Sequence, residues 1–170
     1  MIKILSLFFI LSFLLPSEAN AEECNINSKI FGSSYAQLED KYFGNNKTTM
    51  PDIIKGKFSG DKLCRSLEGY FIELTFFEKD LAKVIISGKS DSPKLIELIE
   101  DNYGKINDRP RQLSDLRTSF AGHTKKNDIF ASYKINPLSD EMFKEQAAIN
   151  ITEVERRMLK YLAVIEDQTQ

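Results

Sequence analysis

The stretch "GYFIELTFFEKDLAKVIIS", residues 69–87, decides the fold. Its first half alternates in the period of a β-strand, in which successive side chains point to opposite sides. A second apolar run, residues 81–87, follows the short polar segment "EKD". This pattern predicts a β-hairpin. The strand residues expected to share its core side are Tyr70, Ile72, Leu74 and Phe76.

Further strands are expected on both sides of this hairpin. Residues 53–58 predict a strand before it. A second hairpin is predicted from "DLRTSFAGH" (115–123) and "DIFASYKI" (128–135), joined by the polar "TKKN". Consecutive hairpins pair their strands in antiparallel fashion, so we expect one antiparallel sheet.

Helix signals precede each group of strands. "SSYAQLEDKYFG" (33–44) carries the capping box Ser34-x-x-Gln37 and ends at Gly44. "SPKLIELIEDNYG" (92–104) has Ser92 as its expected N-cap, Pro93 at the first helical position and a glycine at its end. Parts of the two helices echo each other, "LEDKYFGNN" beside "IEDNYGKIN". Either the chain contains two imperfect α-β-β units, or shared helix-end chemistry produces the echo.

The chain closes with helix. "TEVERRMLKYLAVIEDQ" (152–168) has a Thr152-x-x-Glu155 capping box and an apolar stripe, and a shorter helix capped by Ser139 is expected just before it, over 138–149. We therefore predict an α+β fold: a single antiparallel sheet with helices packed on one face, plus a C-terminal helix. No low-complexity linker divides the chain, so residues 22–170 are expected to form one domain.

The N-terminus indicates export. Lys3 precedes an apolar run from Ile4 to Leu15, which is shorter than the 20 or so residues that a transmembrane helix needs. Residues 19–21, Ala-Asn-Ala, match the small-x-small pattern of a cleavage site, so residues 1–21 are predicted to be a signal peptide cut after Ala21. An uncleaved anchor or a buried N-terminal helix is the alternative. Glu22 and Glu23 precede Cys24 where a lipoprotein has a small residue, which argues against lipidation.

Cys24 and Cys64 are the two cysteines of the chain. In an oxidising compartment such a pair is most simply one disulfide. With the single His123 they offer too few ligands for zinc, and there is no C-x-x-C redox motif. No metal or cofactor is therefore expected.

Catalytic motifs are not found. Gly88-Lys89-Ser90 lacks the earlier glycine of a phosphate-binding loop, because Lys83 stands there. His123 is expected on the surface at the end of a strand. The many carboxylates leave open a two-carboxylate hydrolase acting on envelope polymers.

The net charge and the distribution of charge indicate which classes of partner to expect. The net charge of −2 makes nucleic acid an unexpected partner. The segment from Lys105 to Lys126 is locally basic, which indicates either a solvated face or a site for an acidic partner or an anionic envelope surface.

One group of aromatic residues points to binding. Phe71, Phe77 and Phe130 are out of phase with the core residues of their strands. They would lie on an uncovered sheet face, together with Arg117 of the basic segment, unless the C-terminal helix crosses that face and buries them. An exposed aromatic face is typical of a binding surface.

The sequence thus predicts a small non-enzymatic protein, periplasmic or secreted, that binds another protein of the envelope or the extracellular space. The alternatives are the hydrolase and a carrier of a small apolar ligand. The general layout resembles envelope-assembly subunits and secreted enzyme inhibitors, a comparison that rests on the order of the elements alone and transfers no residues.

Overall fold

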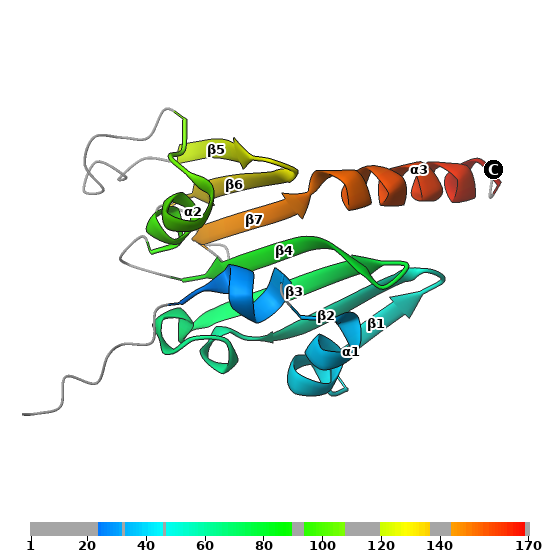
Figure 1. Ribbon diagram of the computed structural model, residues 1–170, viewed down its shortest axis with the longest axis horizontal. Helices are drawn as coiled ribbons and strands as arrows, with labels where there is room; N and C mark the ends of the chain where they lie inside the picture. The colour runs from blue at the N-terminus through cyan, green and yellow to red at the C-terminus, as the bar shows by residue number, and fades with distance from the viewer. Residues whose placement is uncertain are drawn as a thin grey trace, which may run out of the picture.

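The computed structural model describes residues 24–31, 33–45, 47–89, 94–107, 120–136 and 144–168. Within these described residues, seven antiparallel strands form one sheet in the order β1-β2-β3-β4-β7-β6-β5 (Figure 1). The strands are β1 (Lys47–Met50), β2 (Ile53–Ser59), β3 (Tyr70–Phe77), β4 (Asp80–Gly88), β5 (Phe120–Lys126), β6 (Ile129–Ile135) and β7 (Glu145–Ile151). The helical elements are η1 (Asn27–Phe31), α1 (Tyr35–Leu38), η2 (Glu39–Phe43), η3 (Gly60–Lys62), η4 (Arg65–Leu67), α2 (Leu95–Tyr103) and α3 (Thr152–Gln168). The predicted α+β fold is confirmed.

The first hairpin forms as its alternation predicts. β3 and β4 pair from Tyr70 opposite Gly88 to Phe77 opposite Asp80, with an irregularity after Thr75. The even-numbered residues of β3 turn toward the helices and are fully or almost fully buried. They meet the apolar residues of the neighbouring strands in one core cluster. Its members from the sheet include Phe58, Tyr70, Ile72, Leu74, Phe76, Val84, Ile86, Tyr133 and Ile149.

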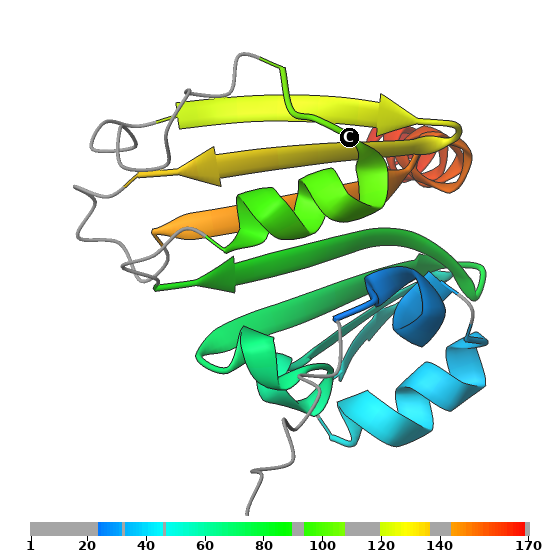
Figure 2. The same ribbon diagram turned by 60° about the vertical axis from the view of Figure 1, so that its left-hand side comes forward.

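Helices cover this first face of the sheet (Figure 2). In the first helical segment, Ser34 and Gln37 form the predicted capping box, and the helix runs on from α1 into η2. Its aromatic residues reach the sheet: the ring of Tyr42 stacks on that of Phe58 with 4.5 Å between centroids. Gly56 leaves the space for the neighbouring Phe43, because a Cβ atom there would come within 2.4 Å of its ring.

The two halves of the sheet repeat one arrangement, a helix followed by a run of adjacent strands, and their last strands, β4 and β7, pair at the centre. The echoed residues hold similar places in the two helices. Leu38 and Ile99 are both buried, as are Tyr42 and Tyr103. Gly44 and Gly104 end the helices with φ of 50° and 97°, the left-handed region that favours glycine.

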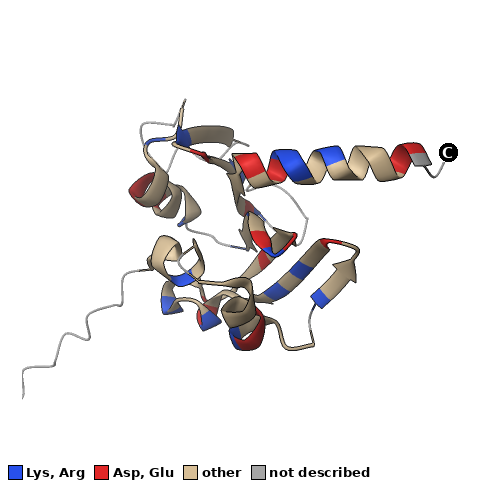
Figure 3. Cartoon of the chain, turned by 45° about the vertical axis from the view of Figure 1, so that its right-hand side comes forward, with Lys and Arg blue, Asp and Glu red and all other residues tan. Residues whose placement is uncertain are grey.

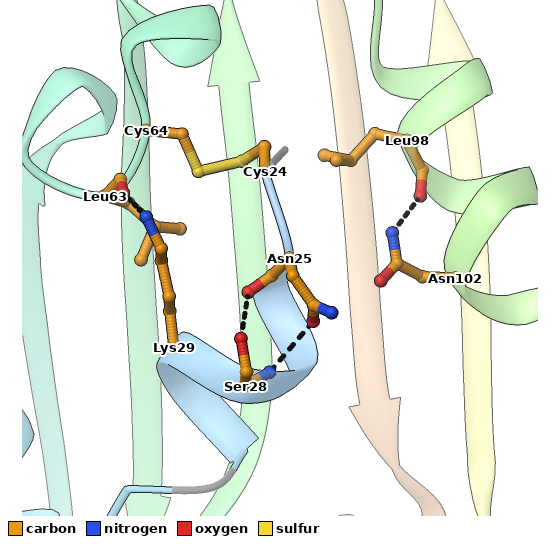
Figure 4. Close-up of a disulfide and its surroundings, with 8 residues drawn as sticks. All are labelled: Cys24, Asn25, Ser28, Lys29, Leu63, Cys64, Leu98 and Asn102. Carbon is orange, nitrogen blue, oxygen red and sulfur yellow. Dashed lines mark hydrogen bonds between the residues drawn. A yellow bond between two sulfur atoms is a disulfide. The ribbon is translucent and has the colours of Figure 1, made fainter. Parts of the chain in front are cut away.

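The disulfide joins Cys24 to Cys64, as predicted, with 5.5 Å between their Cα atoms. It ties the segment just before η1 to the segment between η3 and η4 (Figure 4). Lys29 reinforces this connection, because its Nζ donates to the carbonyl of Leu63 at 3.1 Å. A disulfide fits a location outside the reducing cytoplasm. Among the helices that the structure describes, none is both long and apolar enough to cross a membrane.

The expected helix over 138–149 is wrong from residue 145 onward, where the chain forms β7 instead. "EQAAINI" alternates between buried and partly buried residues, and β7 pairs with β4 on one side and β6 on the other. The alanines suit a helix by intrinsic propensity, but central placement in the sheet overrides that preference. The second hairpin is also displaced: Thr124 to Lys126 belong to β5, and the turn falls at Asn127.

α3 leaves the end of β7 and packs on the second face of the sheet. Its Met158 contacts a small cluster formed by Ile53, Phe77 and Ala82. Arg157 donates to Glu78 at 2.9 Å and to Asp80 at 2.6 Å, which clamps the helix to the turn between β3 and β4. The predicted 152–168 helix is confirmed, and its proximal turns pack as core.

Several predictions fall on other parts of the chain. The signal peptide, its cleavage after Ala21, the caps at Ser92 and Ser139, the residue Pro93, and Arg117 lie outside the described residues.

Candidate functional site

The part of the second face that α3 leaves uncovered is the candidate site, and we call it the open face. Its central row crosses six strands through directly paired residues. A neighbouring row carries the exposed aromatic residue Phe71. The central row consists of Lys57, Glu73, Ile85, Ala148, Ser132 and His123.

Phe71 is an exposed large apolar side chain on this face. Strand alternation directs it away from the core, and 42% of its surface remains accessible. The Nζ of Lys57, on the adjacent strand β2, lies 4.9 Å above the ring centroid. At this distance the ammonium makes a cation–π contact with the ring, worth about 0.5 to 1 kcal/mol at an exposed site.

The aromatic residue at the other end of the face is Phe130. Its ring is partly buried and stacks on the imidazole of His123, with 5.3 Å between centroids and 27° between planes. His123 itself is exposed, as the phase of its strand predicts. The Nδ2 of Asn107 lies 3.5 Å from Nε2 of this histidine. The stacked rings of Phe130 and His123 project together from β6 and β5.

The open face has a hollow next to these two rings. A hollow of about 330 Å³ lies over β5, β6 and β7. Phe130, Ala121 and Ala148 supply its apolar surface, and His123, Ser132 and Lys134 supply polar groups. A volume near the lower end of the range for ligand pockets suits one side chain or a small molecule.

Positive charge dominates the open face. Figure 3 marks the lysines of the strands as blue bands, and the strand pairing gives the side that each one faces. Glu73 is the one acidic residue among the described strand residues of the open face. The α3 residue Glu155 approaches one lysine, Lys83, at 3.9 Å. The lysines on this side of the strands are Lys55, Lys57, Lys83, Lys125 and Lys134.

The three phenylalanines that were predicted to form a binding face differ in their burial and contacts. Phe71 belongs to the open face and Phe130 borders its hollow. Phe77 is 4% exposed, because Tyr161 of α3 packs on it with 5.3 Å between centroids. The alternative that the C-terminal helix covers the second face holds for Phe77 and not for Phe71.

A wider groove lies at the other side of the molecule, near the start of α1. Its volume is about 770 Å³, with Phe31, Tyr35 and Phe76 among its apolar residues. Two carboxylates, Glu39 and Asp80, reach its rim. Each is engaged by a cation, Lys47 and Arg157 respectively. The hydrogen bond from Lys47 holds the pKa of Glu39 below its usual range, which is opposite to what a general acid requires.

The sequence reasoning missed Glu145, a carboxylate that is completely buried in the core. It accepts hydrogen bonds from the hydroxyl of Tyr70 at 2.6 Å and from the backbone N–H of Leu95 at 2.8 Å. Burial raises its pKa, and these hydrogen bonds oppose the rise. A glutamate in phase with Ala147 and Ile149 was the available signal, hidden because a helix was expected there.

Glu145 caps the N-terminus of α2 from a neighbouring strand, in place of a side chain from the residue before the helix. Lys94 precedes the helix and makes no side-chain cap hydrogen bond. A carboxylate at a helix N-terminus is favoured by the unpaired N–H groups and by the dipole. Glu145 therefore explains how α2 is placed on β7, and its enclosed position favours a structural role.

Within the described part of the chain, no cluster of three or more His, Cys, Asp or Glu side chains could hold a metal ion. Compared with known proteins, the chain gives no significant match to a family model, a curated protein or a solved structure.

Proposed function

We propose that this chain is an exported, non-enzymatic binding protein whose open face contacts another protein of the envelope or the extracellular space. The observation that carries the proposal is the exposed aromatic ring of Phe71, fixed under Lys57 on a sheet face that α3 covers only at one end. Rigid aromatic side chains that are already exposed cost little entropy on binding and are enriched at interfaces.

Catalysis has less support. The groove carboxylate Glu39 is held ionised by Lys47, and the carboxyl with a raised pKa, Glu145, is enclosed in the core. A two-carboxylate hydrolase needs one protonated and one ionised group facing the same cleft. These two residues do not share a cleft in the described part of the chain, since Glu145 does not line the groove.

Site-specific photocrosslinking in the producing cells tests the proposal. Benzoylphenylalanine would replace Phe71 or Phe130, and Glu97, exposed on α2, would carry it as the control. We expect one defined protein to be captured from positions 71 and 130 and not from position 97.

The captured protein must then bind the purified chain. Phe71→Ala is expected to weaken this binding at least about tenfold, because truncation of a central aromatic residue typically costs more than 1 kcal/mol. Glu97→Ala should leave the affinity unchanged. An absence of adducts, or the same adducts from all three positions, would refute the proposal.

A carrier of a small apolar ligand is the second candidate, because the groove beside α1 has aromatic walls formed by Phe31, Tyr35 and Phe76. The neutral dye N-phenyl-1-naphthylamine tests it by fluorescence. Saturable binding that Ala36→Trp abolishes would support a carrier, since Ala36 lines the groove. Ser66→Trp on η4 is the control, and a dye response equal in both variants would reject this candidate.

A further inference from the structure

We propose that the hollow over β5, β6 and β7 receives an aspartate or glutamate side chain, so that the partner of the open face presents an acidic segment. This inference rests on the proposed function and names the chemistry of its partner. It concerns the hollow lined by Ala121, His123, Phe130, Ser132, Lys134 and Ala148.

The charge of the hollow selects an anion. Among the residues that the structure describes, Lys134 lies in its lining and no aspartate or glutamate does. Lys125 stands next to it on β5, directly opposite Phe130. An anionic group that enters the hollow would therefore meet a positive potential, and no carboxylate of the described lining would compete with it.

Hydrogen-bond donors are available at the same place. The hydroxyl of Ser132 is partly buried and can donate, and the ammonium of Lys134 is a permanent donor. His123 retains a ring N–H: when the Asn107 amide nitrogen donates to Nε2, the ring proton is on Nδ1. Charge-assisted hydrogen bonds to a carboxylate are about twice as strong as neutral ones.

The shape of the hollow favours a side chain over a free inorganic ion. Phe130 and the methyl groups of Ala121 and Ala148 offer apolar contact to methylene groups. A free phosphate would leave this apolar surface unused. Phe71, 42% exposed on the next row of the same face, would lie beside the flanking residues of an extended segment.

Backbone-amide NMR titration tests the inference with two probes, the peptides acetyl-Gly-Glu-Gly-amide and acetyl-Gly-Gln-Gly-amide. We expect saturable shifts confined to residues 121–123, 132–134 and 146–148 with the glutamate peptide. The glutamine peptide should bind about tenfold more weakly, because it loses the charge assistance.

Lys134→Gln should weaken the glutamate peptide by a similar factor, and Lys62→Gln, an exposed lysine of η3, should not. The same titration is repeated with inorganic phosphate and with vesicles of anionic lipid as alternative anionic ligands. Equal binding of the two peptides, equal effects of the two lysine variants, or saturation by phosphate or vesicles without the glutamate peptide would overturn the inference.

The two proposals can fail separately. Adducts from position 71 together with a failed peptide titration would leave the binding function in place and remove the acidic partner. A successful titration without adducts would leave a carboxylate-binding hollow in place and remove the proposed protein partner.

Discussion

The hydroxyl of Tyr70 donates a hydrogen bond of 2.6 Å to the carboxylate of Glu145 in the interior of the protein. Tyr70 belongs to β3 and Glu145 to β7, and the other carboxylate oxygen accepts from Leu95 at the start of α2. One buried side chain thus connects both halves of the sheet to a helix. Because a buried acceptor is costly unless it is paired, this connection should be visible in stability measurements.

Glu145→Leu is expected to lower the free energy of unfolding by about 3 kcal/mol, because it removes the buried carboxylate that accepts hydrogen bonds from the Tyr70 hydroxyl and the Leu95 N–H. Glu145→Gln keeps an acceptor and a polar group of the same size, so its loss should be about 1 kcal/mol or less. Urea unfolding at pH 7 measures both. Equal losses for Leu and Gln would show that the hydrogen bonds do not matter.

The pH dependence of stability should also change in Glu145→Gln. Burial raises the pKa of Glu145 in the folded state, so the folded protein binds this proton more tightly than the unfolded chain does. The contribution of the group to stability is therefore fully present below the unfolded pKa of about 4.3 and is lost as the pH rises through the folded pKa. We expect the difference in unfolding free energy, wild type minus Glu145→Gln, to fall over this range. Parallel pH profiles would contradict the raised pKa.

Phe77 and Phe71, which the sequence places on the same face, should respond differently to truncation. Phe77→Ala removes a buried ring under α3 and is expected to cost about 3 to 5 kcal/mol. Phe71→Ala removes an exposed ring and should change stability by about 1 kcal/mol or less. Thermal or urea unfolding of the two variants makes the comparison, and similar losses would show that α3 does not cover Phe77.

Removal of the disulfide should destabilise the protein. The Cys24→Ala/Cys64→Ala variant opens a loop of 40 residues, which the chain-entropy relation values at about 4 kcal/mol. Unfolding of the variant and of the wild type under non-reducing conditions gives the difference. Thiol titration of the denatured, unreduced wild type should find no free cysteine, and an intact mass should lack residues 1–21. Two titratable thiols, or no change in stability, would contradict the bridge.

The turn between β3 and β4 offers a stabilising substitution. Lys79 has φ of 71°, in the left-handed region where residues other than glycine are strained by about 1 to 2 kcal/mol. Lys79→Gly should relieve this strain and raise the free energy of unfolding by about 1 kcal/mol. Lys57→Gly, in the middle of β2, is the control and should lower it by a similar amount, since glycine in a strand has no such benefit.

Much of the scaffold could be predicted from local patterns. The alternation of residues 69–87 is confirmed by β3 and β4, and the capping box at Ser34 and Gln37 forms as expected. Gly104 ends α2 and Cys24 pairs with Cys64. The hairpin, the capping box and the glycine at the helix end depend on residues that are close in sequence. The disulfide follows from the presence of two cysteines in the chain.

The candidate site was only partly predictable. The phase of β3 and β6 placed Phe71 and Phe130 on the second face, but it could not show where α3 would lie. The hollow beside Lys134 requires three strands to be adjacent, β5, β6 and β7, and the last of these was expected to be a helix.

By itself, the sequence determined the first hairpin, the capping box of Ser34 and Gln37, the glycine ends of two helices and the pairing of the two cysteines, because short-range periodicity, capping chemistry and a count of cysteines specify them. Tertiary structure alone decided that "EQAAINI" is a central strand, that Glu145 caps α2, and that α3 covers Phe77 while leaving Phe71 exposed. The physical reason is that burial depends on which surfaces meet across the sheet. Residues far apart in the chain supply those surfaces, so no local pattern records them.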